Sequence, residues 1–213
     1  SGQTGTDVFT VPFTPSFLIV DMNEKTTNAI VSYNSVISAP ATVSFDYAYS
    51  DIFVNNLTDS IFVRAEHHKV APDPVVSNPD IFRISESRYW RITGIVPAGT
   101  DYQLRFDYNR TNIFFDSGLL PQNASTDSLI LVYRPGPGYD WQLFPFTKTG
   151  NDFSGFLKTP YGLLGEYALA VGQPNQSGIA EPGSESDLLI FPNPCSDLLQ
   201  IANIPQNCTE ITI

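Results

Sequence analysis

The chain of 213 residues is poor in charged side chains, and in basic ones above all. Only 15% of its residues are charged, and 11 Lys and Arg stand against 22 Asp and Glu, for a formal net charge of −11. Phosphate contacts from Lys and Arg dominate nucleic-acid affinity, and anionic lipid repels an acidic chain. We therefore expect neither nucleic acid nor a membrane surface as a partner. No apolar run approaches the ~18 residues of a membrane-spanning helix, so no membrane span is expected.

Histidine is scarce as well, since His67 and His68 are the only two in the chain. They are adjacent and follow a strand-like segment, in which neighbouring side chains point to opposite faces. The zinc-peptidase motif H-E-x-x-H, which places two histidines on one helical face, does not occur, and neither does the nucleophile motif G-x-S-x-G. We expect structural histidines, and no catalytic residue, metal site or bound cofactor.

Carboxylates are the remaining candidates for catalytic or metal-binding residues. Asp46 and Asp107 occupy matching positions in two similar segments, which invites comparison with the paired carboxylates of glycosidases. Both lie on the polar side of expected strands, where solvated aspartates are common, so we assign them no catalytic role. Acidic loops at 50–51 and 71–73 offer oxygen ligands that suit a calcium ion, although no D-x-D-x-D pattern accompanies them.

Alternation of apolar and polar residues is the strongest positive signal. In 42–50 and 101–110 every second side chain is apolar, which is typical of strands with one buried and one solvated face. Segment 128–133 is apolar on both faces and suits a central strand. Further strands are expected at 17–21, 29–36, 52–54, 60–65, 88–95, 141–146, 155–158 and 165–171. With turn residues between them and no sustained helical period, the chain is predicted to be all-β, an Ig-like antiparallel β-sandwich.

A weak internal repeat runs through the predicted sandwich. Phe45-Asp-Tyr47 recurs as Phe106-Asp-Tyr108, and Thr58-Asp-Ser-Ile61 recurs as Thr126-Asp-Ser-Leu129. Two copies of one strand unit fit either two halves of a single sandwich or two small domains. We favour the single sandwich, because neither copy alone is long enough to close two layers.

Composition divides the chain along its length. Residues 1–38 are expected to carry N-terminal strands that lead from a domain upstream of this chain, and residues 39–172 the sandwich. Residues 173–186 are rich in Pro, Gly, Ser and Gln and lack aromatics, which is typical of a linker. A new strand–turn–strand begins at 187. Because the chain starts without a signal-peptide pattern and stops within an expected strand, we expect a piece of a longer protein.

Aromatic side chains make up 13% of the chain. Most lie on the apolar side of their strands, including Trp90 and Trp141, and are expected in the core. Tyr139, Phe153 and Tyr161 fall in expected loops and are the candidates for contact with a ligand. Such contacts would matter if the sandwich recognises carbohydrate.

Cys195 and Cys208 are the only two cysteines. They fall at opposite ends of an expected hairpin, farther apart than the ~7 Å between Cα atoms that a disulfide allows. We expect two unpaired thiols.

The last segment carries a specific motif. Leu189-Ile-Phe-Pro-Asn-Pro-Cys-Ser-Asp-Leu-Leu-Gln-Ile201 has an aromatic before P-N-P, then a small residue, an Asp and an alternating strand. It resembles the start of the C-terminal sorting domain of type IX secretion cargo in Bacteroidota, a small β-sandwich whose later strands are missing here. The motif residues are Phe191, Pro192, Asn193, Pro194 and Asp197. The resemblance covers 187–213 and implies a truncated tail, the type IX export machinery as a partner, and a secreted or cell-surface location.

A second resemblance covers about 10–172. Ile19-Val-Asp-Met-Asn-Glu24, Phe62-Val-Arg-Ala-Glu-His-His-Lys-Val-Ala-Pro-Asp73 and Arg88-Tyr-Trp-Arg-Ile92 look like the region after the catalytic domain in secreted aminopeptidase-N-like zinc peptidases of these bacteria. That family's zinc motif lies upstream of this region, so no residue here inherits a catalytic role. The resemblance implies a non-catalytic region that spaces or supports an upstream catalytic domain of the same parent chain. The alternative is a carbohydrate- or surface-binding module, or adhesin.

Overall fold

The computed structural model describes residues 8, 10–19, 29–120 and 126–173, together with the backbone of 189–191 and 200–202. The chain divides into two compact units, Ser1–Asn175 and Gln176–Ile213. The strands of the first unit are β1 (Ile30–Ile37), β2 (Ala41–Phe45), β3 (Ser50–Asn56), β4 (Ile61–His68), β5 (Ile81–Ile84), β6 (Tyr89–Ile95), β7 (Asp101–Asn109), β8 (Leu129–Arg134), β9 (Gln142–Phe144), β10 (Thr147–Gly150), β11 (Ser154–Lys158) and β12 (Gly165–Gly172). Two short 3-10 helices, η1 (Asp46–Ala48) and η2 (Thr126–Ser128), complete it.

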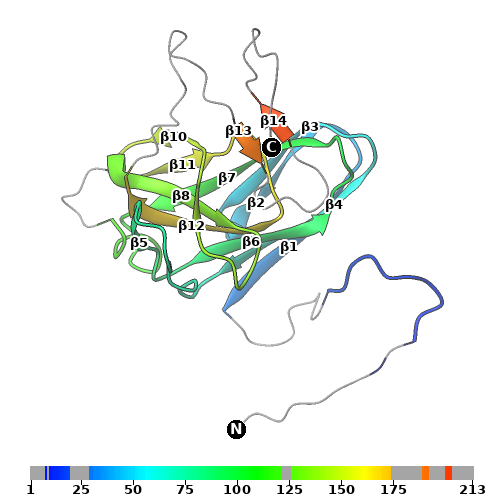
Figure 1. Ribbon diagram of the computed structural model, residues 1–213, viewed down its shortest axis with the longest axis horizontal. Coiled ribbons are helices and arrows are strands. Elements are labelled where there is room, and N and C mark those ends of the chain that lie inside the picture. Colours follow the sequence, from blue (N-terminus) through cyan, green and yellow to red (C-terminus); the bar gives the residue numbers. More distant parts are fainter. Residues whose placement is uncertain are drawn as a thin grey trace. The chain divides into compact units, whose positions relative to one another are not determined.

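These strands form two antiparallel sheets that pack face to face (Figure 1). The first sheet has the order β1-β4-β6-β12-β8-β9, and β5 pairs with the part of β12 that follows its pairing with β6. The second sheet has the order β10-β11-β7-β3-β2. The all-β sandwich predicted from the alternation is confirmed.

One apolar core fills the space between the sheets. In β7 every second residue from Tyr102 to Tyr108 is buried and the residues between them are partly exposed, as the alternation predicts. Trp90 is fully buried in this core, and its indole N–H donates to the carbonyl of Ala48 at 2.6 Å. The paired indole nitrogen removes the cost of burying a polar group in apolar surroundings.

A second, smaller apolar cluster lies on the opposite face of the first sheet. Its buried members are Ile81, Ile130, Val132, Trp141, Ala168 and Ala170. Those on β8 and β12 alternate with residues of the main core, so they occupy the other side of the sheet. The chain between β4 and β5 packs on this face, where the Trp141 indole N–H donates to the carbonyl of Asp73 at 2.9 Å. Cover on both faces explains why β8 is apolar from Leu129 to Val132.

The segment 42–50 is not the single strand that the alternation predicts. β2 ends at Phe45, η1 follows, and Tyr49 adopts a left-handed backbone conformation (φ 52°) before β3 begins. As a result Ala48 is fully buried and Tyr47 is 68% exposed, the reverse of the expected sides. Alternation predicts which side chains face the core only within one uninterrupted strand. After a tight connection the order of buried and exposed positions starts anew.

The strands of the structure differ from the ranges predicted from the sequence in two places. β1 pairs with β4 along its whole length, from Ile30 opposite His68 to Ile37 opposite Ile61, so the boundary expected at 38 falls after the first strand of the sheet. Residues 17–19 of the strand expected at 17–21 form no strand. Of the repeated tripeptides, 106–108 lies within β7 and 45–47 spans the end of β2 and η1, so the internal repeat stays a prediction.

The second unit contains one strand pair in its described backbone. β13 (Leu189–Phe191) pairs antiparallel with β14 (Gln200–Ala202), with Ile190 opposite Ile201. Residues 174–186 of the linker expected at 173–186 lie outside the described residues, as do the motif residues Pro192, Asn193, Pro194 and Asp197 and both cysteines. Of the helices in the described part of the chain, none has the length and apolar character to cross a membrane.

Candidate functional site

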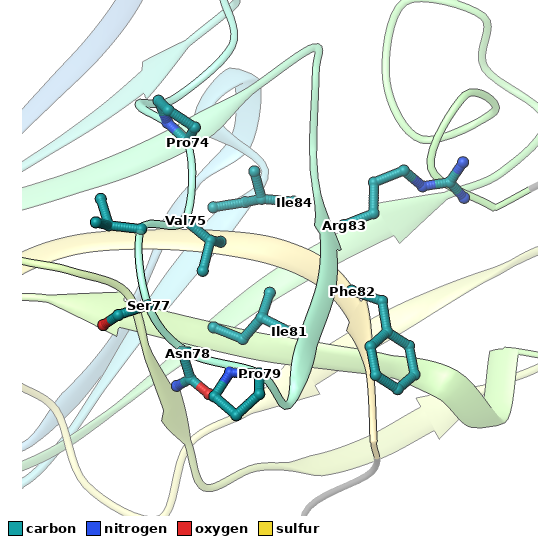
Figure 2. A pocket seen from close by; sticks show the side chains of 10 residues that line it. Pro74, Val75, Ser77, Asn78, Pro79, Ile81, Phe82, Arg83 and Ile84 are labelled. Carbon is teal, nitrogen blue, oxygen red and sulfur yellow. The ribbon is translucent and has the colours of Figure 1, made fainter.

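Two hollows in the sandwich are candidates for a site. The larger, about 440 Å³, lies between the segment 74–79 and β5. Figure 2 shows Val75, Ile81 and Ile84 pointing into this hollow from its two sides. Apolar side chains thus form part of its wall, and Ser77, Asn78 and Arg83 add polar groups.

The polar groups beside this larger hollow are already engaged. The Ser77 hydroxyl donates to the Asp140 carboxylate at 2.7 Å, and the backbone N–H groups of Val76 and Ser77 donate to it at 2.8 and 2.7 Å. Burial raises the pKa of Asp140, but these hydrogen bonds together outweigh it and lower the pKa to about 2. Asp140 thus fixes the segment 74–79 over the second apolar cluster, and the hollow offers few free polar groups to a ligand.

The second hollow, about 370 Å³, is the better candidate, and we call it the arginine cleft. Its polar side chains include Arg88, Arg105 and Asp107, and its rings are those of Tyr49, Tyr108, Phe115 and Phe156. Arg105 and Asp107 come from the outward-facing side of β7, and Phe156 lies opposite Asp107 on β11. The cleft therefore opens on the outer face of the second sheet.

A fully buried ion pair lies beneath the arginine cleft. Arg88 Nε and Nη2 donate to the two carboxylate oxygens of Asp116 at 3.0 and 2.7 Å, and the two side chains are 1% and 0% exposed. Arg88 Nη2 also donates to the carbonyl of Asp107 at 2.6 Å, and Asp116 accepts the backbone N–H of Asn109 at 2.7 Å. Arg88 Nη1 is buried and has no hydrogen-bond partner among the described residues.

Arg105 forms the wall of the cleft on β7. Its guanidinium pairs with Asp51 and lies 4.8 Å from the centre of the Phe156 ring. Arg105 Nε is 3.7 Å from Asp107 Oδ1, too far for a hydrogen bond, and has no other partner in the described chain. The Arg105 and Asp107 side chains are 31% and 41% exposed, although Arg105 Nε itself is buried. Burial raises the pKa of Asp107, and the Arg105 charge offsets this only in part.

His67 lies behind the cleft and belongs to the core. It is fully buried, with its ring centre 5.5 Å from that of Tyr49, 5.6 Å from that of Trp90 and 5.7 Å from that of Phe115. Burial lowers the pKa of His67 to about 3, and the nearby Arg88 charge adds to the effect. His68 points to the other face of β4 and stacks on Tyr89 at 4.3 Å. The opposite orientation predicted for the two side chains is what the structure has.

Acid should destabilise the sandwich through His67. The pKa of His67 falls from 6.5 to about 3 on folding, so the unfolded chain takes up the proton first and stability falls as the pH drops through this window. Between about pH 7.5 and 5, before carboxylates titrate, the loss from His67 alone should be roughly 2 kcal/mol. Urea unfolding at a series of pH values measures it. His67→Phe should remove this slope and His68→Phe should keep it; an unchanged slope in His67→Phe would contradict the assignment.

The aromatic residues predicted as ligand contacts lie apart from both hollows. Tyr139 and Phe153 are 54% and 60% exposed, and Tyr161 is half-buried with its ring 5.2 Å from that of Phe144 in the main core. None of the three is among the residues that line either hollow. As ligand contacts they stay predictions.

The sequence did not single out the arginine cleft. Arg105 looks there like an ordinary polar residue of a half-buried strand, and Asp107 is considered only as a carboxylate paired with Asp46 and is assigned no role. The alternation on β7 does show that they share the outer face, but not that Phe156 lies beside them or that Arg88 arrives from the other sheet. Those neighbours depend on strand order, which no local pattern encodes.

The acidic loops considered for calcium have arginine partners. Asp51, which lies in β3 and not in the loop predicted at 50–51, pairs with Arg105, and Asp73 accepts from Arg134 at 2.7 Å. Across residues 29–120 and 126–173 no three His, Cys, Asp or Glu side chains gather closely enough to hold a metal ion. Asp46 lies exposed in η1 and Asp107 on β7.

In comparison with known proteins, no family model, no curated protein and no solved structure matches the chain.

Proposed function

We propose that the sandwich is a non-catalytic module of a secreted, multi-domain zinc peptidase, and that it spaces or supports the catalytic module of that protein. Residues 187–213 would be the start of its type IX sorting signal. The two sequence resemblances support the parent class and the export route. The non-catalytic role is supported by one structural observation: buried charged side chains of the sandwich form ion pairs with one another.

These buried charges are engaged with one another. Besides Arg88 and Asp116, Arg134 donates to Glu166 at 2.7 Å through Nε, and their side chains are 5% and 3% exposed. A general acid or base must exchange a proton with its substrate, whereas the Asp116 and Glu166 carboxylates are buried against guanidinium groups of the same chain. Fixed pairs of this kind suit a rigid support.

A row of alternating charges crosses the first sheet on its outer face. By strand register Glu66 lies opposite Arg91, Arg91 opposite Glu166, and Glu166 opposite Arg134. Opposite charges directly across neighbouring strands stabilise their pairing. Burial alone would raise the pKa of Glu66, but hydrogen bonds from His68 and Arg64 lower it to about 2, so Glu66 stays ionised at neutral pH. The row strengthens the sheet rather than supplying a proton donor.

A hydrolysis assay tests the non-catalytic role. We expect the chain to cleave neither aminoacyl nitroanilides nor peptides with added zinc, because its buried charges are clamped in pairs. A chelator should leave its melting temperature unchanged. The parent protein with its upstream domain is the positive control. Zinc bound at one equivalent together with measurable turnover by this chain would overturn the proposal.

Export is tested separately in a host that has the type IX machinery. The parent protein should reach the medium or the cell surface, and the double variant Asn193→Ala, Asp197→Ala should remain inside. Arg91→Lys, in the sandwich, is the matched control and should be exported normally. Equal export of all three proteins would refute the sorting role of the motif.

A further inference from the structure

We propose that the arginine cleft binds an uncharged saccharide unit. This goes beyond the supporting role proposed above, which needs no ligand. The inference depends on three features of the cleft: hydrogen-bond donors without acceptors, an accessible carboxylate beside them, and aromatic walls.

The donors come from the two arginines. Arg105 Nε and Arg88 Nη1 are both buried and find no acceptor in the described part of the chain. Buried N–H groups in native proteins are almost always hydrogen-bonded, so two such groups in the lining of one cleft call for acceptors from a ligand. Hydroxyl oxygens meet this need.

The acceptor is the Asp107 carboxylate. It is 41% exposed, and its Oδ1 lies 3.7 Å from Arg105 Nε without bonding to it. A hydroxyl group both donates and accepts, so one hydroxyl, or two on neighbouring carbons, can accept from Arg105 while donating to Asp107. A ligand with only acceptors or only donors would leave one of these groups unmatched.

The walls of the cleft combine aromatic rings with polar side chains. The rings of Tyr49 and Phe115 pack edge to face at 4.7 Å on one side, and Phe156 stands next to Asp107 on β11. Sugar rings carry apolar C–H faces that pack on such surfaces. The volume of about 370 Å³ is within the roughly 300–1,000 Å³ of small-molecule sites, which combine apolar walls with a few placed polar groups.

Charge argues for a neutral ligand. The two guanidinium groups are already surrounded by three carboxylates, those of Asp51, Asp107 and Asp116, and the chain carries a net charge of −11. An anionic ligand would meet repulsion that these arginines cannot offset. A cationic ligand would bring further N–H donors, and these cannot accept hydrogen bonds from Arg105 Nε and Arg88 Nη1.

The experiment is an NMR titration of the whole chain with neutral disaccharides as probes: cellobiose, maltose, lactose and chitobiose, with digalacturonate as the acidic arm. We expect at least one neutral probe to bind with a Kd of about 1 mM or tighter and to shift the Nε–H signal of Arg105. Asp107→Ala and Phe156→Ala should each weaken binding by about tenfold or more. Asp101→Ala, an exposed acid of the same strand outside the cleft, and Arg91→Lys are controls that should bind normally.

Several results would overturn the proposal. These are no binding of any neutral probe up to about 10 mM, binding that both cleft variants leave unchanged, or binding of digalacturonate alone. Thermal melting shows whether each variant is folded. If a cleft variant does not fold, the Nε–H signal of Arg105 in the wild-type protein tests the site instead. A neutral probe that binds without shifting this signal would contradict binding in the arginine cleft.

Discussion

Asp116→Ala should lower the free energy of unfolding by about 3–5 kcal/mol. The substitution leaves the Arg88 guanidinium buried at 1% exposure without its counter-charge, and it also removes the acceptor of the Asn109 backbone N–H. Breaking one half of a buried pair costs far more than the intact pair contributes, because a lone charge stays in a medium of low dielectric. Urea unfolding at neutral pH measures the loss.

The matched control for Asp116 is Asp127→Ala. Asp127 also pairs with a cation, Lys148 at 3.3 Å, but its side chain is 87% exposed. An exposed pair contributes about 0–1 kcal/mol, so the control should be nearly neutral. The double variant Arg88→Met, Asp116→Leu should recover part of the loss, since it removes both charges at once. Similar costs for Asp116→Ala and Asp127→Ala would mean that Arg88 reaches solvent.

Phe106→Ala should also cost about 3–5 kcal/mol, through the cavity that it opens. Phe106 is fully buried in the main core, with its ring centre 5.0 Å from that of Trp90 and 4.8 Å from that of Tyr167. Its neighbour Asp107 faces outward on the same strand, 41% exposed. Asp107→Ala should therefore change stability by only about 0.5 kcal/mol.

This pair of variants tests directly which side chains of β7 point into the core. Chemical denaturation of both proteins under one set of conditions gives the two costs with the same reference. If Asp107→Ala cost as much as Phe106→Ala, the outward position of Asp107 would be wrong. The comparison also tells whether Asp107→Ala can serve in the saccharide titration without loss of fold.

Local pattern determined most of the fold class from the sequence alone. A strand repeats its facing every two residues, so the alternation in 101–110 identifies both the strand and its buried side, and the structure has Phe106 inside and Asp107 outside. The same rule places His67 and His68 on opposite faces, and the core positions expected for Trp90 and Trp141 are confirmed by their full burial. These predictions need no knowledge of which strands are neighbours.

Tertiary structure alone decided where strands break and which residues meet. The turn at Phe45–Tyr49 resets the facing of Tyr47 and Ala48, and the chain before β5 covers the outer face of the first sheet and so gives Trp141 a core of its own. Ligand contacts were sought among loop aromatics such as Tyr139, whereas the arginine cleft is built largely from the polar side of β7, Phe156 of β11 and Arg88, the residue before β6. Sequence periodicity describes each strand separately, but a site is made by strands that the fold brings side by side.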